Sequence, residues 1–116
     1  MCKFIGVEIL AANVLINLIE SGKRRSVSLE ELNKCGIEVV NILEKKFNEK
    51  AVVLYDKTRI GSFVVDYSDF FKFEDDTLYV KDNVEDTEQL RDWFRGTLSY
   101  EILSAIITSV KSLLKN

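Results

Sequence analysis

The 116-residue sequence contains no histidine. Histidine is the commonest general base and the commonest metal ligand in proteins, so its absence removes the serine–histidine and cysteine–histidine pairs of nucleophilic catalysis. An enzyme built on this chain would have to use carboxylates, lysine, tyrosine or arginine alone. We therefore expect a protein that is not an enzyme.

Cysteine and proline are also scarce. Only Cys2 and Cys35 are present, which is too few for a disulfide framework, and free thiols are typical of the reducing cytoplasm. Two separated cysteines without histidine also lack the ligands of a structural zinc site. Because the chain has no proline, its turns depend on glycine, asparagine and aspartate. We expect a cytoplasmic protein that folds without a metal or a cofactor.

The longest apolar run, from Phe4 to Ile19, raises the question of a signal peptide or a membrane span. Glu8, Asn13 and Asn17 interrupt it, and it is shorter than the ~20 apolar residues of a membrane-spanning helix. A core helix fits better, with no contact to a membrane. The apolar fraction of 47% and the charged fraction of 30% are typical of one folded domain, here residues 1–116.

Hydrophobic periodicity predicts an α+β fold with two N-terminal helices, an antiparallel β-meander of about four strands and two C-terminal helices. The helices are expected at residues 5–21, 29–48, 86–95 and 99–114, and the strands at 51–55, 60–67, 70–73 and 77–80. Ser28 and Glu31 have the spacing of a capping box, which marks the start of the second helix. Gly36 weakens that helix by about 1 kcal/mol relative to alanine, so the helix either continues through Gly36 or breaks there.

Acidic residues are concentrated between Asp66 and Asp92. Ten acids against three bases give this segment a net charge of −7, whereas the whole chain carries −3. Such an uneven field favours contact with a basic surface and disfavours contact with phosphate. Aromatic residues crowd the same region, and aromatic rings are enriched in protein interfaces.

The leading hypothesis is a small cytoplasmic binding protein that occludes a basic surface of a protein partner, including a partner that itself binds nucleic acid. A regulator or inhibitor of bacterial or phage origin fits this description. Direct binding of nucleic acid is disfavoured by the charge. The predicted partner-binding residues are Asp69, Phe70, Glu74, Asp75, Asp76, Glu85 and Asp86, with Phe70 as an apolar anchor.

A winged-helix DNA-binding regulator is the alternative. Residues 28–34 would form its first helix, residues 35–37 the turn, residues 38–48 the recognition helix and residues 51–67 the wing. Asn41, Lys45 and Lys46 would contact the DNA. The sequence pI of about 5.0 opposes this interpretation, because DNA binding depends on neutralising phosphate.

A carboxylate–metal enzyme is the third hypothesis. The oxygen ligands of magnesium or calcium would come from Asp66 with Asp69, or from Asp82 with Glu85 and Asp86. Turns and helix caps explain such carboxylates without an ion, so no metal site is expected.

The first and last predicted helices each have an apolar arc wider than one contact needs. The sequence therefore also predicts a homodimer or a larger assembly.

Overall fold

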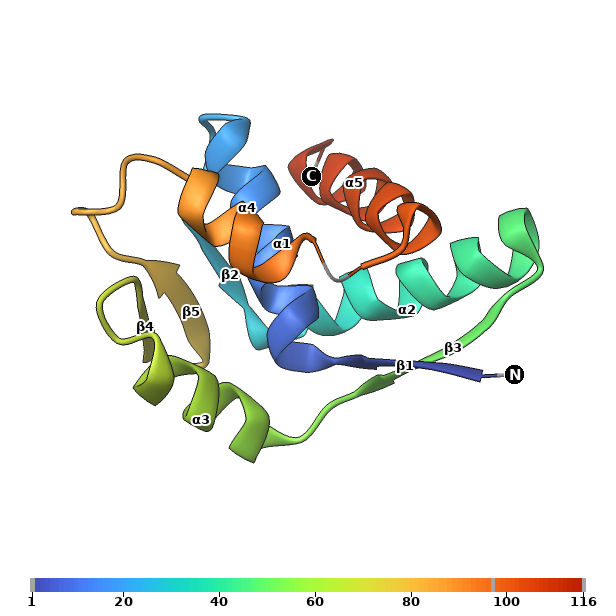
Figure 1. Cartoon of the computed structure of the whole chain (residues 1–116), viewed down its shortest axis with the longest axis horizontal. Coiled ribbons are helices and arrows are strands. Elements are labelled where there is room, and N and C mark those ends of the chain that lie inside the picture. Colours follow the sequence, from blue (N-terminus) through green and yellow to red (C-terminus); the bar gives the residue numbers. More distant parts are fainter. Residues whose placement is uncertain (1, 97, 116) are drawn as a thin grey trace.

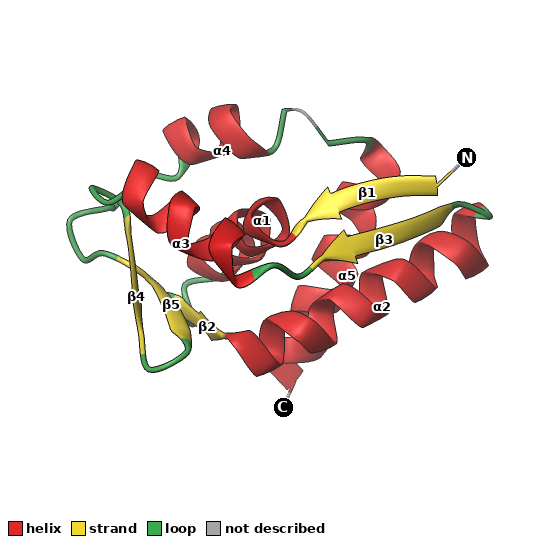
Figure 2. Cartoon of the chain, turned by 90° about the horizontal axis from the view of Figure 1, so that it is seen from below, coloured by secondary structure: helices red, strands yellow, loops and turns green. Residues whose placement is uncertain are grey.

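The computed structural model describes residues 2–96 and 98–115. The order of elements is β1 (Cys2–Gly6), α1 (Val7–Glu20), β2 (Ser26–Ser28), α2 (Leu29–Phe47), β3 (Lys50–Leu54), α3 (Lys57–Asp66), β4 (Phe71–Glu74), β5 (Thr77–Val80), α4 (Glu88–Phe94) and α5 (Tyr100–Lys115). The strands form two small sheets beside a group of helices (Figures 1 and 2). This mixture fits the predicted α+β class, but the order of helices and strands differs from the prediction.

Helix α1 lies at the centre of the core, as predicted. Residues 10–16 have no exposed surface, and α1 contacts α2, α3, α4 and α5. Its wide apolar arc is thus covered by helices of the same chain, so α1 gives no support to a second subunit. Gly22 follows the helix with a φ of 73°, the left-handed conformation in which many helices end.

Residues 2–6 form strand β1, where the sequence predicts no strand. β1 pairs in parallel with β3, and Phe4 lies opposite Val52. The strand predicted at 51–55 is confirmed as β3, but its predicted antiparallel partner is wrong. The parallel pairing needs a long crossover, which α1, β2 and α2 supply. A short apolar run has no clear period, so β1 cannot be distinguished from the start of a helix.

Residues 57–66 form helix α3, so the turn and the return strand predicted here are wrong. The Asp56 side chain caps the helix by accepting a hydrogen bond from the Thr58 amide at 3.0 Å. Ile60 and Phe63 are buried and Val64 packs against the core, which is the spacing of a helical face. The β-branched residues suggested a strand, but burial of this face outweighs that weak propensity.

The predicted hairpin of β4 and β5 is confirmed. The two strands are antiparallel with Glu74 opposite Thr77, so Asp75 and Asp76 form a two-residue loop. Their φ angles are 52° and 54°, and positive φ at both positions is the pattern of a type I′ turn. β2 joins the other edge of β5. The predicted four-stranded meander is therefore a three-stranded sheet ordered β2-β5-β4.

Helix α2 runs without a break from its capping box. The Ser28 hydroxyl accepts a bond from the Glu31 amide and the Glu31 carboxylate accepts one from the Ser28 amide, both at 3.1 Å. Gly36 stays helical, and the Tyr55 ring lies against it, where a β-carbon at Gly36 would collide with the Tyr55 hydroxyl. Glycine at this position makes room for a neighbouring side chain.

The winged-helix alternative is contradicted on both of its structural requirements. Residues 35–37 lie inside α2 and form no turn, and residues 57–66 are helical, so no wing exists at 51–67. Asn41, Lys45 and Lys46 are exposed on α2, but the recognition-helix geometry that gave them a role is absent.

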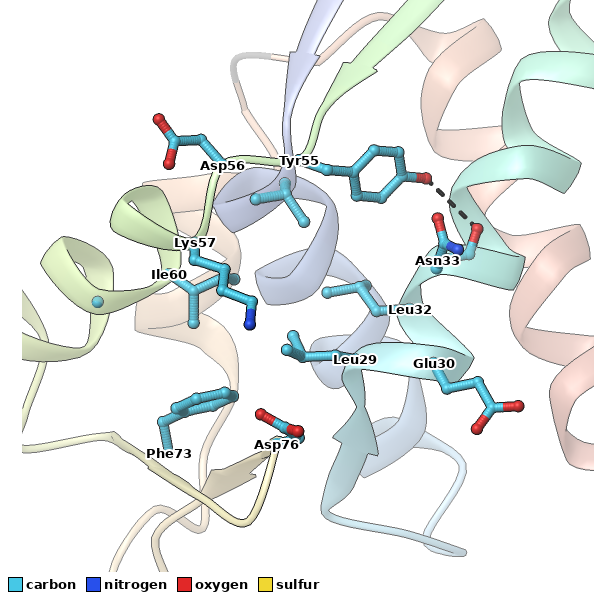
Figure 3. A pocket seen from close by; sticks show the side chains of 12 residues that line it. Leu29, Glu30, Leu32, Asn33, Tyr55, Asp56, Lys57, Ile60, Phe73 and Asp76 are labelled. Carbon is cyan, nitrogen blue, oxygen red and sulfur yellow. Dashed lines mark hydrogen bonds between the residues drawn. The ribbon is translucent and has the colours of Figure 1, made fainter.

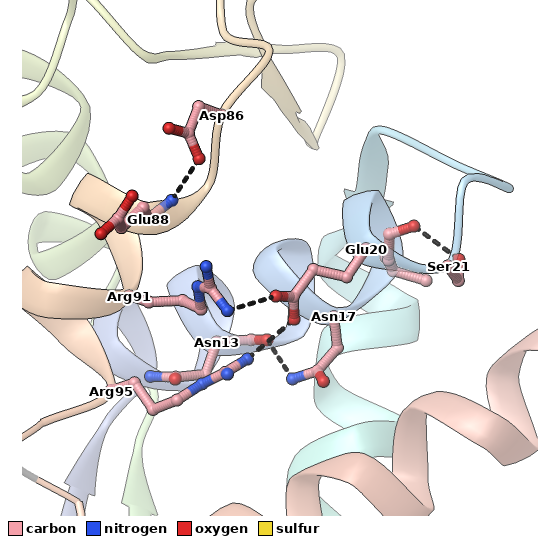
Figure 4. A network of polar contacts seen from close by, with 9 residues as sticks. Asn13, Asn17, Glu20, Ser21, Asp86, Glu88, Arg91 and Arg95 are labelled. Carbon is pink, nitrogen blue, oxygen red and sulfur yellow. Dashed lines mark hydrogen bonds and ion pairs between the residues drawn. The ribbon is translucent and has the colours of Figure 1, made fainter.

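Polar contacts fasten the short helix α4 to α1 (Figure 4). The Glu20 carboxylate pairs with Arg91 at 3.3 Å and with Arg95 at 2.9 Å. The buried Asn13 side chain donates to the Phe94 carbonyl at 3.2 Å. These bonds compensate for the small number of turns in α4, because a helix this short needs tertiary contacts to persist.

Helix α5 matches the helix that the sequence predicts at residues 99–114. The Ser99 hydroxyl accepts a hydrogen bond from the Ile102 amide at 3.3 Å. α5 packs on α1 and α2. Across residues 2–96 and 98–115, none of the helices has both the length and the apolar character that a membrane crossing requires.

Candidate partner-binding surface

The seven predicted partner-binding residues lie at the two ends of the β4–β5 hairpin. Glu74, Asp75 and Asp76 form the turn at one end, which we call the turn group. Asp69, Glu85 and Asp86 lie near the other end, which we call the loop group, because the chain after β5 returns there. Hydrogen bonds join the two segments, from the Lys81 amide to the Phe70 carbonyl at 2.8 Å and from the Asn83 side chain to the Asp69 carbonyl at 3.4 Å. The predicted acidic residues therefore form two groups.

The acidic segment from Asp66 to Asp92 is exposed and has no internal compensation. All ten of its carboxylate residues are exposed. Within the part of the chain that the structure describes, none of the ten forms an ion pair, whereas Glu8, Glu20, Glu30, Glu31 and Glu49 do. The negative charge that the sequence concentrates here thus faces solvent unneutralised.

The three bases of the same segment leave a net charge of −7. Arg91 pairs with Glu20, which lies outside the segment. The Lys72 ammonium lies 5.1 Å from the centre of the Tyr79 ring, a distance at which a cation and a ring attract each other. The ten carboxylates of the segment can therefore attract positive charge on another molecule.

Arg25 holds the loop that carries Glu85 and Asp86. Its guanidinium donates to the carbonyls of Lys81 and Val84, each at 2.6 Å. One guanidinium nitrogen, Nη2, donates to both backbone carbonyls, and these charge-assisted bonds fix the path of the loop. The loop group is therefore presented by an anchored segment.

The aromatic residues near the loop group form a packed cluster. The Trp93 ring lies 5.2 Å from the Phe70 ring and 5.6 Å from the Tyr67 ring, measured between centroids. Trp93 packs α4 onto the end of α3 and the start of β4, yet 40% of its surface stays exposed. Phe70 is half-buried beneath it. Trp93, and not Phe70, is thus the more exposed aromatic ring at this end.

A groove that the sequence did not reveal lies beside the turn group. It has a volume of about 490 Å³ and is bounded by the start of α2, the start of α3 and the hairpin turn (Figure 3). Its apolar lining comes from Val7, Leu29, Leu32, Ile60 and Phe73, with the Tyr55 ring along one side. In this paper we call it the α2–α3 groove.

The local sequence explains how the groove keeps its shape. The Leu29 amide donates to the Asp76 carbonyl at 2.9 Å, which fastens the hairpin turn to the first residue of α2. The Tyr55 hydroxyl donates to the Asn33 carbonyl at 3.3 Å (Figure 3), which fastens the chain after β3 to α2. Burial raises the pKa of Tyr55, and the nearby Cys35 raises it further, so this hydroxyl keeps its donor proton at neutral pH.

The rim of the groove is mainly acidic. Glu30, Asp56 and Asp76 contribute carboxylates, and Lys57 contributes the one cation among the lining residues. Asp56 caps α3, and its hydrogen bonds from Thr58 lower the pKa of its carboxyl group. The Glu30 and Asp56 side chains add negative charge beside the turn group, to which Asp76 belongs.

The carboxylates do not gather into a metal centre. Among the residues that the structure describes, no group of three or more His, Cys, Asp or Glu side chains is close enough to hold a metal ion. Asp86 instead accepts a hydrogen bond from the Glu88 amide at 2.9 Å (Figure 4). The side chain of Asp86 therefore orders the start of α4, as its predicted capping role requires.

No known protein family, no curated protein sequence and no solved structure matches this chain. Its function is therefore inferred from the charge, the exposed rings and the groove.

Proposed function

We propose that this protein is a small, non-enzymatic binding protein that occludes a basic surface of a protein partner. The observation that carries the proposal is the set of ten exposed carboxylates between Asp66 and Asp92, none of which forms an ion pair in the described residues. A stable domain needs a net charge of only about 2–8 in magnitude for solubility over its entire surface. A charge of −7 on this one segment, against −3 for the whole chain, reaches the upper part of that range on a fraction of the surface.

The mechanism is electrostatic steering followed by steric occlusion. Carboxylates on the turn and loop groups raise the rate at which a basic surface encounters the protein, and salt screens this attraction. The exposed face of Trp93 adds apolar area, and tryptophan is enriched among the residues that dominate binding energy. A regulator or inhibitor acts in this way when the covered surface is the one its partner needs.

The experiment compares three double variants that each remove two negative charges. Asp75→Asn/Asp76→Asn neutralises the turn group, and Glu85→Gln/Asp86→Asn neutralises the loop group. Glu44→Gln/Glu101→Gln is the matched control, because both glutamates lie outside the acidic segment. Asparagine is chosen at Asp75 and Asp76 because it tolerates their positive φ, and at Asp86 because it keeps an oxygen for the cap.

Each variant and the parent protein are immobilised and exposed to host-cell extract at low and high salt, and bound proteins are quantified by mass spectrometry. We expect a basic protein that the parent and the control retain at low salt and release at high salt. The turn or the loop variant retains at least tenfold less. Equal retention by all four proteins contradicts the proposal.

A further inference from the structure

We propose that the α2–α3 groove receives one bulky apolar side chain from a segment of the partner in which that residue is flanked by lysine or arginine. The inference rests on the proposed function and names the chemistry of the partner at one part of its surface. It combines the shape of the groove, its exposed apolar walls and the charge of its rim.

The volume suits a single large side chain with its adjoining backbone. Ligand pockets in proteins measure roughly 300–1,000 Å³, and the groove, at about 490 Å³, falls at the lower end. Its floor is the buried core surface of Val7, Leu32 and Ile60. An apolar side chain that enters it contacts fixed neighbours, so little reorganisation opposes binding.

Two aromatic side chains that line the groove are partly exposed in the free protein. Tyr55 is 46% exposed and Phe73 is 38% exposed, and Figure 3 places them on opposite sides of Leu29 and Ile60. Phe71 and Phe73 lie on the same face of strand β4, but only Phe71 is buried, and Phe73 lines the groove. An apolar guest would cover both rings, and burial of such exposed area is what drives association.

The rim selects the charge of the guest. Glu30 lies on α2, Asp56 precedes α3 and Asp76 lies in the hairpin turn, so acidic residues border the groove from three elements, and Glu30 also pairs with Lys34 at 3.8 Å. Lysine and arginine beside the apolar residue can reach these carboxylates through their long flexible stems. Phosphate-bearing guests, such as nucleic acid or lipid headgroups, are repelled by the same three groups.

Lys57 provides a test of whether the segment that binds in the groove is basic or acidic. It is the one cation among the lining residues, and Figure 3 shows its side chain extending over the groove between Ile60 and Leu29. A basic guest is repelled by this ammonium, so Lys57→Gln should strengthen binding. An acidic guest would lose affinity in the same variant.

Gly61 permits the groove to be blocked without damage to the fold. It lies on α3 and lines the groove, and a β-carbon added there meets nothing within 4 Å. Gly61→Leu therefore places bulk at the mouth, and it also replaces a poor helix former. Asn33→Leu adds bulk from the opposite wall on α2. The matched control is Ser62→Leu, because Ser62 is exposed on α3 and lines a different pocket.

The probe is a synthetic peptide with a central phenylalanine between two lysines on each side, titrated into the isotopically labelled full chain and followed by NMR. Two further peptides replace the phenylalanine with serine or the lysines with glutamates. We expect amide shifts centred on the lining residues, at least tenfold weaker binding by the serine and glutamate peptides, and severalfold tighter binding of the first peptide by Lys57→Gln. Gly61→Leu and Asn33→Leu each weaken it at least tenfold, while Ser62→Leu leaves it unchanged.

The inference is overturned if the phenylalanine peptide does not bind at millimolar concentration, if the serine or the glutamate peptide binds equally well, or if neither blocking variant weakens binding. These outcomes are separable from failure of the proposed function. A partner whose capture depends on Asp75 and Asp76 but not on Gly61→Leu preserves the acidic surface and removes the groove. A partner that ignores both charge variants removes the proposed function itself.

Discussion

The contact between Gly36 and Tyr55 shows how one residue without a side chain determines the position of another. Glycine in a helix interior usually lowers stability, and here it lies in the middle of α2. The absence of a β-carbon allows the Tyr55 ring to lie against the helix and reach the Asn33 carbonyl. Gly36 thus lowers the helix stability of α2, but it allows the Tyr55 ring to form one wall of the α2–α3 groove.

A double-mutant cycle tests this exchange. Gly36→Ala should change the free energy of unfolding by less than about 0.5 kcal/mol, because a helix gain of about 1 kcal/mol is offset by displacement of Tyr55 and loss of its hydrogen bond. In a Tyr55→Ala background the same substitution should stabilise by about 1 kcal/mol. Urea denaturation of the four proteins measures both values. Identical effects in the two backgrounds would show that Tyr55 does not limit position 36.

Glu31 links the capping box to pH. Burial acts to raise its pKa, but hydrogen bonds from Arg24 and from Ser28 outweigh burial, and the pKa of Glu31 is lowered from its usual 4.5. A lowered folded-state pKa means that the charged form stabilises the fold. This contribution is complete above the unfolded-state pKa and disappears as the pH falls through the folded-state value.

Replacement of Glu31 by glutamine should expose that dependence. Glutamine keeps an acceptor for the Ser28 amide but loses the 2.7 Å ion pair with Arg24. At pH 7 we expect Glu31→Gln to be less stable by about 0.5–1 kcal/mol, as for a partly exposed pair. The difference should shrink below about pH 4.5. A difference that stays constant from pH 7 to pH 3 would assign the loss to geometry alone.

At the scale of elements, the β4–β5 turn has a backbone that its sequence does not favour most. Asp75 and Asp76 both have positive φ, a conformation in which Asn-Gly is the strongly preferred pair. Asp75→Asn/Asp76→Gly should therefore raise the free energy of unfolding by about 1 kcal/mol. Thermal and urea denaturation measure the gain.

The matched control for this turn is Asp75→Ala/Asp76→Ala, which removes the same charges. Alanine pays about 1–2 kcal/mol at each left-handed position, so this variant should be less stable than the parent. If both variants changed stability equally, charge repulsion and not backbone conformation would dominate the turn.

Some helices and strands could be predicted from local sequence patterns alone. The capping box at Ser28 and the pair of strands around Asp75 each carry a local signal, and the structure confirms both. Helix α3 carried such a signal too, since the Asp56 cap precedes apolar residues at helical spacing. The β-branched residues of this segment favour a strand, and this weak propensity led to the wrong prediction. The pairing of β1 with β3 had no local signal, because the partners are distant in the chain.

The whole molecule sets the limits of the site prediction. Exposure of the acidic residues follows from their type, and the structure places them at the surface, while their role in binding stays a prediction. The α2–α3 groove could not be predicted, because Val7, Leu32, Ile60 and Phe73 come from different elements that only the tertiary fold brings together. The sequence also predicts a strand at residues 60–67, where the structure has helix α3, so the α3 wall of the groove was not predicted.

Oligomeric state is a property of the whole molecule, and the homodimer stays a prediction. Helix α1 no longer supports the homodimer, because helices of the same chain cover it. Ile107 and Tyr100 are exposed on α5. Phe4 and Val52 lie beside each other on the small parallel sheet and are 69% and 44% exposed. We expect light scattering at micromolar and higher concentrations to give a dimer mass. Phe4→Ser and Ile107→Ser would identify which surface holds it. A monomer mass at all concentrations contradicts the prediction.

The parallel pair of β1 and β3 has a consequence for synthesis of the protein in the cell. Cys2 pairs with Lys50 and Gly6 with Leu54, so β1 leaves the ribosome well before β3 and has no partner until the residues between them have followed. At a translation rate of about 5–20 residues per second, the wait lasts roughly two to ten seconds. During that interval Phe4 and the apolar helix after it are uncovered. The amino-terminal segment is therefore where a nascent chain of this protein most needs a chaperone.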